Sequence, residues 1–284
     1  MKETRLRDIR LLAVDLDGTA LDDDKKLSPE TLDAFGKLME NGIYLCISSG
    51  RCWPGISKYA QQVRPNAPVI SCNGALLLSP SGEVLQKTVL DEEDALRILS
   101  LAEERDTSVV IWLGNTLYAN RLNDRTLDYG RRYGGGIVPV IGADYERMAR
   151  EGIQKILWYD TVEKACVWSG ECRDWPLKNV NIFTSEPGFI EFFSKDVSKG
   201  SMLMTVCDRL NVPGDSCCAV GDGENDIPML QAAAFSAAMG NAADEVKRFA
   251  DTVLLSNNEN GVAKLIWDIL YDKSKRVKRG KRSL

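Results

Sequence analysis

The apolar positions at the start of the chain follow the pattern of alternating strands and helices. Residues 9–14 form a short apolar run, which is typical of a buried parallel strand. Residues 27–42 carry apolar side chains at helical spacing, and Ser28 is a suitable N-cap for that helix. The apolar runs at 43–48 and 67–72 predict two further strands with a helix between them. Such alternation is typical of a parallel sheet with helices on its faces.

The middle of the chain has a different pattern. Residues 81–185 contain short apolar runs separated by glycine-containing turns, which indicates antiparallel α+β structure. Strand–helix alternation resumes near Ser198. We therefore predict an α/β protein. Its Rossmann-like parallel-sheet core has helices on both faces and consists of residues 1–80 and 186–272, interrupted by an inserted α+β cap domain at 81–185.

The segment at 273–284 has seven basic and no acidic residues, whereas the whole chain has a formal net charge of -5. This composition predicts a flexible, solvated tail. No aromatic residue lies among the charges, so the tail gives no support for base stacking, and a nucleic-acid partner is not favoured.

Composition places the protein in a broad class. No window approaches the roughly 18 consecutive apolar residues of a membrane span, and the first ten residues contain no apolar secretory region. We therefore expect a cytoplasmic protein without a membrane partner, either a monomer or a homodimer. The eight cysteines contain no Cys-x-x-Cys pair. Cys46, Cys72 and Cys218 lie in or beside apolar runs, which favours reduced, buried thiols over a disulfide framework.

The chain contains no histidine. This excludes Ser-His-Asp triads, Cys-His pairs, histidine metal ligands and histidine acid–base catalysis. Chemistry near neutral pH must then use carboxylates, Lys, Tyr, Cys or a metal with oxygen ligands.

Candidate catalytic groups stand where apolar strands end or helices begin. In an open parallel sheet, ligands bind beyond the carboxyl ends of the strands, so these groups are expected to converge there. They are Asp15 and Asp17 after the first strand, Ser49 and Gly50 after the second, Lys199 at a helix start, and Asp222, Asn225 and Asp226 after the apolar run at 217–221.

The carboxylates predict a metal site. Asp15, Asp222 and Asp226 together would be strongly anionic, and Mg²⁺ suits a few carboxylates with waters and a substrate phosphate. An EF-hand calcium loop is excluded because its sixth position requires Gly, whereas the two acidic loops have Ala20 and Ile227 there.

These groups can be given roles in phosphoryl transfer. Asp15 can attack phosphorus and form an aspartyl-phosphate, which water then hydrolyses. Lys199, Ser49 and the backbone N–H of Gly50 can hold the phosphoryl oxygens. Asp17 lies close enough to protonate the leaving oxygen and later deprotonate water. Burial beneath a cap would raise the pKa of Asp17 and bound Mg²⁺ would lower it, so only its role is predicted.

The ordered motifs resemble those of the haloacid dehalogenase-like hydrolases, in particular the Cof-type phosphatases with a C2 cap. The matching stretches are DLDGT, SSGR, CNGA, SKGSML, GDGENDIPML, AMGNAADEVK and NNENGVAKLI, which span nearly the whole chain except the tail. The resemblance implies Asp15 as nucleophile and Asp17 as general acid/base. It also implies that Asp15, the backbone carbonyl of Asp17 and Asp222 bind Mg²⁺, with Asp226 in support.

The same resemblance implies phosphate contacts from Ser49, Gly50, Lys199 and Asn225, and an inserted cap that closes over the site. Ser49 replaces the family's usual Thr and keeps the hydroxyl. The loop at 129–140 and the CNGA turn are candidates for contacting the substrate.

The leading hypothesis is a Mg²⁺-dependent phosphatase of small phosphorylated metabolites, such as sugar phosphates or phosphorylated cofactors. A phosphotransferase or mutase on the same site, and a non-catalytic regulatory binding protein with this fold, are the alternatives. A dehalogenase is disfavoured because Asp17 supplies a second acid that carbon–halogen displacement does not need.

Overall fold

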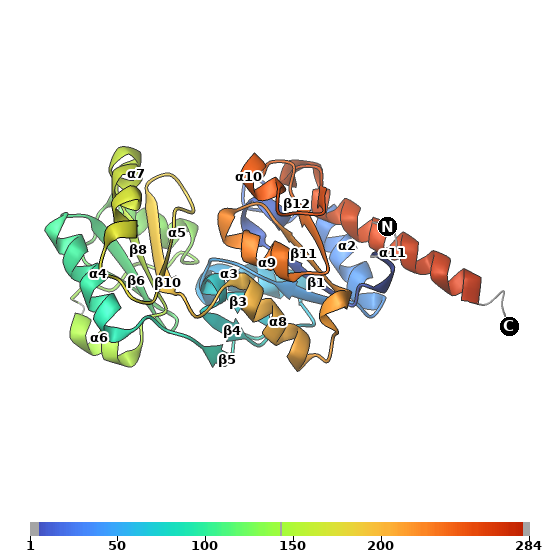
Figure 1. The fold of residues 1–284 in the computed structure, drawn as a ribbon, viewed down its shortest axis with the longest axis horizontal. Coiled ribbons are helices and arrows are strands. Elements are labelled where there is room, and N and C mark those ends of the chain that lie inside the picture. The colour runs from blue at the N-terminus through green and yellow to red at the C-terminus, as the bar shows by residue number, and fades with distance from the viewer. Residues whose placement is uncertain (1–5, 143, 281–284) are drawn as a thin grey trace.

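The computed structural model describes residues 6–142 and 144–280 (Figure 1). Its central sheet has the order β13-β12-β11-β1-β2, and every pair in it is parallel. All four residues of β1 are buried, as expected for a strand covered on both faces. The strands are β1 (Leu11–Val14), β2 (Tyr44–Ile47), β11 (Cys217–Gly221), β12 (Phe235–Ala238) and β13 (Thr252–Val253).

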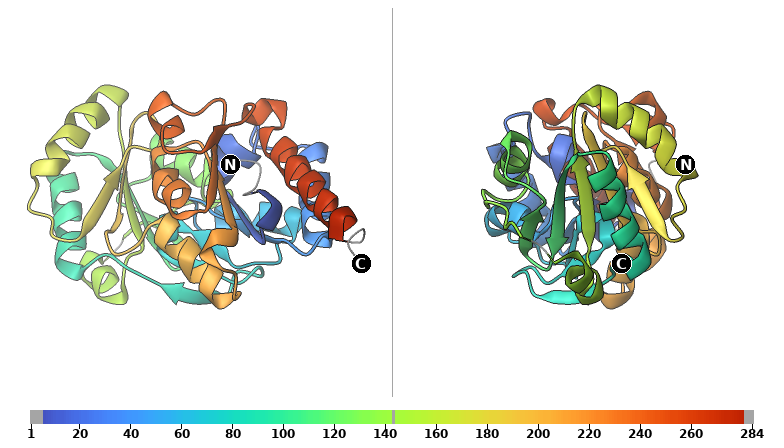
Figure 2. Two further views of the ribbon diagram at one scale, coloured as in Figure 1. Left: turned by 45° about the vertical axis from the view of Figure 1, so that its right-hand side comes forward. Right: turned by 90° about the vertical axis from the view of Figure 1, so that its left-hand side faces the viewer.

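Helices cover both faces of this sheet. Helix α11 packs against α2, and α8 packs against α9, with the strands between these two pairs (Figure 2). The core helices are α2 (Pro29–Glu40), α3 (Trp53–Val63), α8 (Lys199–Arg209), α9 (Ile227–Ala232), α10 (Asp244–Lys247) and α11 (Gly261–Gly280). Short helical turns are η1 (Leu6–Asp8), η2 (Leu16–Ala20), η3 (Cys72–Gly74), η4 (Cys172–Asp174), η5 (Gly214–Ser216), η6 (Glu224–Asp226) and η7 (Asn257–Glu259). The predicted α/β fold class is confirmed.

A small antiparallel sheet extends the core at the β2 edge. It consists of β3 (Val69–Ser71), β4 (Leu76–Leu78) and β5 (Val84–Lys87) in that order. A parallel bridge between Ser48 and Ile70 joins it to the end of β2. The turn after β3 therefore lies beside the loop after β2.

The inserted unit is built on a second sheet, with the order β7-β6-β8-β10-β9 and antiparallel pairing throughout. Its strands are β6 (Ser108–Leu113), β7 (Thr116–Ala119), β8 (Lys155–Tyr159), β9 (Val180–Phe183) and β10 (Phe189–Ser194). Its helices are α4 (Glu92–Glu104), α5 (Asp124–Arg132), α6 (Tyr145–Glu151) and α7 (Val162–Glu171).

Alternation along these strands separates two apolar faces. Val109 and Ile156 pack with α4, α6 and α7 in a cluster of their own, whereas Val110 and Leu157 join the large cluster of the core. Because successive strand residues point to opposite faces, Lys155 shares the core-directed face with Leu157. The inserted sheet therefore presents selected side chains to the core.

The sheet pairings correct the domain boundaries expected from the sequence. Strand β5 pairs with β4 on the core side, although residue 81 was the predicted start of the cap. Strand β10 pairs with β8 and β9, although the cap was predicted to end at 185. Local patterns could not show which sheet a strand joins. We propose that the cap runs from the end of β5 to the end of β10.

The described part of the basic segment, residues 273–280, is helical, and its flexibility stays a prediction. Helix α11 continues to Gly280, and residues 281–284 lie outside the described residues. Lys and Arg favour helix, and no proline interrupts this stretch, so the helix has no local reason to stop at residue 272. No helix in the described ranges is long and apolar enough to cross a membrane.

Cysteine pairing differs from the prediction at one place. Cys52 and Cys72 form a disulfide, with their Cα atoms 5.0 Å apart, so the prediction of reduced thiols was wrong for this pair. The two residues are 20 positions apart and meet because the segments after β2 and β3 converge. Cys46 and Cys218 are buried free thiols, as expected.

Candidate active site

The predicted nucleophile stands at the end of β1. Asp15 is 5% exposed, and its backbone N–H donates to the carbonyl of Val220 on neighbouring β11. Gly18 follows with φ of 73°, and a Cβ there would lie 2.2 Å from Asp222 Oδ2. Thr19 Oγ1 donates to Asp222 Oδ1 at 2.8 Å. The turn after β1 therefore needs glycine to fit against the Asp222 carboxylate.

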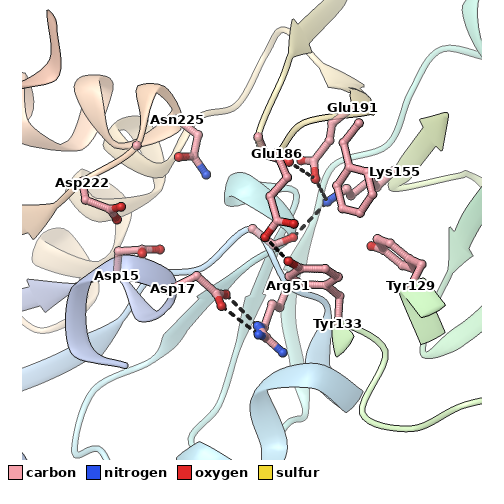
Figure 3. A pocket seen from close by; sticks show the side chains of 14 residues that line it. Asp15, Asp17, Arg51, Tyr129, Tyr133, Lys155, Glu186, Glu191, Asp222 and Asn225 are labelled. Carbon is pink, nitrogen blue, oxygen red and sulfur yellow. Dashed lines mark hydrogen bonds and ion pairs between the residues drawn. The ribbon is translucent and has the colours of Figure 1, made fainter. Parts of the chain in front are cut away.

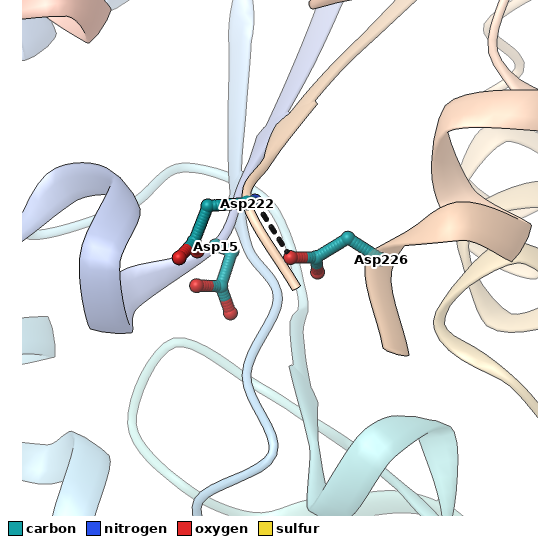
Figure 4. A group of neighbouring side chains, drawn as sticks. All are labelled: Asp15, Asp222 and Asp226. Atoms are coloured by element: carbon teal, nitrogen blue, oxygen red, sulfur yellow. Dashed lines mark hydrogen bonds between the residues drawn. The ribbon is translucent and has the colours of Figure 1, made fainter. Parts of the chain in front are cut away.

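Three carboxylates gather at this rim (Figure 4). Asp15, Asp222 and Asp226 each offer an oxygen atom, and these atoms lie within 4.8 Å of one another. Burial raises the pKa of Asp15 well above its ordinary value, and nearby Asp226 and Asp222 add to that effect. Burial and the Asp226 charge raise the pKa of Asp222 to about 7. The cluster thus lacks sufficient positive charge of its own.

Lys199 supplies one cation to the cluster. It is the first residue of α8, and Ser198 Oγ caps that helix by accepting from Ser201 N–H. Its Nζ atom lies 2.6 Å from both Asp15 Oδ1 and Asp226 Oδ1. Burial alone would lower the pKa of Lys199, but the two carboxylates raise it above its ordinary value. One ammonium against three carboxylates leaves negative charge in excess.

The donor set fits a hard divalent cation. Such ions prefer carboxylate oxygens, and a bound cation would offset the charge that raises the pKa values of Asp15 and Asp222. One oxygen of Asp226 already has protein partners. Asp226 Oδ2 accepts from the backbone N–H groups of Asp222 and Gly223, both at 3.0 Å. Asp226 therefore holds the Asp222 loop and Lys199 in place.

Asp17 has a very different environment from these neighbours. Arg51 donates to both of its oxygens, at 2.7 and 2.8 Å, and Lys25 Nζ lies 3.1 Å from Oδ1. Burial would raise the pKa of Asp17, but Arg51 and Lys25 lower it to about 2. Asp17 is therefore ionised at neutral pH in this arrangement.

Arg51 connects Asp17 to the cap. Its guanidinium lies over the rings of Tyr59 in the core and Tyr133 in the cap, 5.7 and 4.9 Å from their centroids. Its Nη1 also donates to the carbonyl of Arg132 at 2.7 Å. Arg51 therefore contacts both Asp17 in the core and two residues of the cap.

Two of the predicted phosphate-binding residues, Gly50 and Asn225, lie next to each other. Gly50 and Asn225 line a cavity, and a Cβ at Gly50 would lie 3.5 Å from Asn225 Nδ2. Ser49 is 1% exposed, and its Oγ accepts from the Arg51 backbone N–H at 3.1 Å. Ser49, Lys199 and Asp226 lie behind the cavity wall, in contact with residues that form it.

The cavity has a volume of about 120 Å³ and lies between core and cap (Figure 3). The core contributes three of the predicted carboxylates, and the cap contributes aromatic and charged side chains. Its lining is Asp15, Asp17, Gly50, Arg51, Asp222, Gly223 and Asn225 from the core, with Tyr129, Tyr133, Lys155, Ser185, Glu186, Phe189 and Glu191 from the cap.

Comparison with known proteins decides the family. The family model described as haloacid dehalogenase-like hydrolase matches residues 12–266. The chain belongs to the haloacid dehalogenase-like hydrolases. The resemblance seen in the sequence motifs is thereby confirmed.

Curated relatives of this hydrolase include phosphatases. Phosphatase YwpJ of Bacillus subtilis (strain 168) is 29% identical over 287 residues, covering 92% of this chain and 100% of that protein. The 5-amino-6-(5-phospho-D-ribitylamino)uracil phosphatase YitU of the same strain is 27% identical, covering 90% of this chain and 96% of the relative. A haloacid dehalogenase-like hydrolase from Bacteroides thetaiotaomicron has a TM-score of 0.81 at 26% identity, covering 92% of this chain and 99% of that one.

Sequence reasoning missed several side chains around the cavity of this hydrolase. The side chains of Arg51, Lys155 and Glu191 were not among the predicted site residues. The available signal was a single charged residue within each of two apolar strands, at Lys155 in β8 and Glu191 in β10. Buried charges of this kind require partners and often mark functional sites.

Proposed function

We propose that this hydrolase is a Mg²⁺-dependent phosphatase of small phosphorylated metabolites that acts through an aspartyl-phosphate on Asp15. The observation that carries the proposal is the position of Asp15, buried at the edge of a capped cavity between Lys199 and the Asp222 carboxylate. The family match and the phosphatase names of two relatives support the same reaction class.

The first step would form a bond between an Asp15 oxygen and phosphorus and break the bond between phosphorus and the ester oxygen. Lys199 contacts Asp15 Oδ1, so the other carboxylate oxygen is available for attack. Lys199, Asn225 and the Gly50 N–H would hold phosphoryl oxygens, with Ser49 assisting at the same loop.

Asp17 would give a proton to the leaving oxygen and later take one from the water that hydrolyses the aspartyl-phosphate. Its ion pair with Arg51 keeps it deprotonated in the arrangement described here. Asp17 must therefore leave Arg51 before it can donate. We infer that this contact changes during each turnover.

Asp15, Asp222 and the Asp17 backbone carbonyl would hold Mg²⁺, with Asp226 in support. When bound, the ion supplies positive charge near the phosphoryl oxygens and reduces repulsion between them and Asp15. The charge balance favours this role, because Lys199 alone does not neutralise the cluster.

The cavity supports a small substrate. Its volume of about 120 Å³ is below the range of about 300–1,000 Å³ that is usual for drug-sized ligands. Its charged and aromatic lining suits a polar leaving group, such as that of a sugar phosphate or a phosphorylated cofactor. A cytoplasmic location and a monomeric or homodimeric state stay predictions.

The proposal is tested by screening phosphorylated metabolites for phosphate release, with Mg²⁺ and with excess chelator. We expect release to require Mg²⁺ and Asp15→Asn to abolish it, because an amide is a poor nucleophile at phosphorus. Full activity in excess chelator would overturn the metal assignment, and near-normal turnover of Asp15→Asn would overturn the nucleophile. Phosphate transfer to a sugar hydroxyl without release would indicate a phosphotransferase.

A further inference from the structure

Two charged cap residues are buried opposite the carboxylate cluster. Lys155 and Glu191 are 2% and 5% exposed, and Lys155 Nζ lies 2.7 Å from Glu191 Oε1. Both project from the cap sheet toward the core side of the cavity (Figure 3). Burial of two charges is costly, and their pairing offsets only part of that cost. The other hydrogen bonds of Lys155 and Glu191 therefore indicate the role of the pair.

Each residue also contacts a core loop. Lys155 Nζ donates to the backbone carbonyl of Gly50 at 3.2 Å. Glu191 Oε2 accepts from Asn73 Nδ2 at 3.0 Å, and Ser185 donates to its other oxygen at 2.9 Å. Gly50 belongs to the loop after β2, and Asn73 to the turn after β3. Lys155 and Glu191 thus form hydrogen bonds with two neighbouring loops of the core.

Asn73 also contacts Asn225, which is proposed above to bind phosphate. Asn225 Nδ2 donates to Asn73 Oδ1 at 2.9 Å. Asn73 is 2% exposed and has φ of 57°, and its backbone N–H donates to the Ser49 carbonyl at 3.1 Å. Its side chain is therefore held between Glu191 on one side and Asn225 on the other.

The hydrogen-bonding capacities of Glu191, Asn73 and Asn225 decide which group donates and which accepts in each of these contacts. An ionised carboxylate only accepts hydrogen bonds, so Glu191 requires the NH₂ group of Asn73 to face it. The side-chain oxygen of Asn73 then faces Asn225, and Asn225 must donate to it from its own NH₂ group. The Asn225 oxygen is turned to the backbone, where a Cβ at Gly223 would lie 2.6 Å from it. Among the described residues, the Asn225 NH₂ group donates to Asn73, and Asn225 itself lines the cavity, so its second N–H is available to a ligand there.

We propose that Glu191 and Lys155 are positioning residues for phosphate binding. Glu191, acting through Asn73, turns the Asn225 amide so that an N–H faces the phosphate, and Lys155 holds the Gly50 carbonyl so that the loop keeps its orientation. Because both come from the cap, the core completes its phosphate site only when the cap is seated. This inference rests on the proposed function and adds a coupling between cap closure and phosphate affinity.

The test measures inorganic phosphate binding by calorimetry with Mg²⁺, and steady-state kinetics on p-nitrophenyl phosphate. In Glu191→Gln, the new amide can present either an acceptor or a donor to Asn73, so the orientation is lost. We expect Glu191→Gln and Asn73→Ala to weaken phosphate binding about tenfold or more, as expected for losing a hydrogen bond to a charged group. Asp160→Asn is the control, since it removes another buried cap carboxylate away from the cavity, and it should leave phosphate affinity within about twofold.

A double-mutant cycle separates positioning from general damage to the fold. In an Asn225→Ala background, Glu191→Gln should cause little further loss, because there is no amide left to orient. Equal losses in both backgrounds would overturn the proposal. If Glu191→Gln does not fold, the Lys155→Met/Glu191→Met double variant replaces the buried pair with apolar side chains of similar size and can be measured instead. Its phosphate affinity should fall in the same way, and parental affinity would overturn the proposal.

The alternative role for Glu191 is direct contact with the leaving group. That role predicts unchanged phosphate affinity and a raised KM only for esters larger than p-nitrophenyl phosphate, and this result would overturn our inference. Phosphate binding requires no turnover, so a parent protein that binds phosphate but hydrolyses no ester would contradict the proposed function alone. A parent that binds no phosphate would overturn the positioning role as well.

Discussion

Asp17 and Asp222 show how two carboxylates at one rim acquire opposite properties. Both are half-buried, and both line the same cavity. Asp17 has Arg51 and Lys25 beside it, so its pKa is lowered to about 2, whereas burial and Asp226 raise the pKa of Asp222 to about 7. The nearest charges, and not burial, therefore separate the two groups.

The proposed role of Asp17 predicts a dependence on the leaving group. Asp17→Asn should lose about 10²- to 10⁴-fold in rate on an alkyl phosphate, whose leaving oxygen needs a proton. The loss should be smaller on p-nitrophenyl phosphate, whose leaving group needs little protonation. Asp24→Asn, which changes an exposed carboxylate nearby, is the control. An identical loss on both esters in the phosphorylation step would show that Asp17 is not the leaving-group acid.

The Asp17 ion pair also predicts a pH dependence of stability. The folded pKa of about 2 lies below the unfolded value of about 3.9, so ionisation of Asp17 favours the folded state. That contribution is complete above about pH 4 and is lost as the pH falls toward 2. We expect the parent to be more stable than Asp17→Asn near neutral pH, by an amount that shrinks below about pH 4. Urea unfolding across this range measures it, and a difference that grows on acidification would contradict the assignment.

At the scale of elements, the site depends on how closely helices and turns approach one another. Helix α8 begins with Lys199, and its second residue is Gly200. A Cβ at Gly200 would lie 2.2 Å from the Pro228 carbonyl of α9. This close approach brings the start of α8 next to the loop that bears Asp222 and Asp226. The glycine thereby positions the ammonium among the carboxylates.

Two Gly→Ala variants test this packing argument. Gly200→Ala should destabilise the protein by about 1–3 kcal/mol and lower turnover, because α8 and α9 must separate. Gly36→Ala is the matched variant within α2, where a Cβ meets nothing within 4 Å, and it should stabilise by about 0.5–1 kcal/mol. Thermal unfolding and phosphate release measure both effects. Equal changes in stability for the two variants would refute the packing argument.

At the scale of the whole molecule, the cap and core share one cavity. Tyr129, Tyr133 and Phe189 of the cap form an aromatic cluster with ring centroids 5.6–5.9 Å apart, and this cluster faces the carboxylate rim. A small leaving group can be enclosed there, whereas a protein surface cannot enter while the cap is seated.

The enclosed cavity predicts selectivity by size. We expect kcat/KM for an intact phosphoprotein to be at least about tenfold below that for small phosphate esters, because closure over the bound phosphate would be blocked. A short phosphopeptide from the same protein serves as the control for phosphate chemistry. Comparable rates on the phosphoprotein and the small esters would show that the cap does not restrict access.

The sequence by itself determined the parallel core and the positions of its main catalytic candidates. Asp15 and Asp222 could be placed at one rim because each follows a buried apolar run, and parallel strands end at the same edge. Lys199 could be placed at a helix start because Ser198 precedes it as a cap. These features depend on local periodicity, which a single chain displays directly.

Only the tertiary structure decided which distant segments meet. It assigned β10 to the cap sheet, joined Cys52 to Cys72 and brought Arg51 against Asp17. It also placed Glu191 against Asn73, 118 positions earlier in the chain. Such contacts arise from sheet pairing and domain packing, and their energies depend on burial and partners that no local pattern specifies. The candidate catalytic residues could therefore be proposed from the sequence, whereas the side chains that contact them from distant segments required the assembled fold.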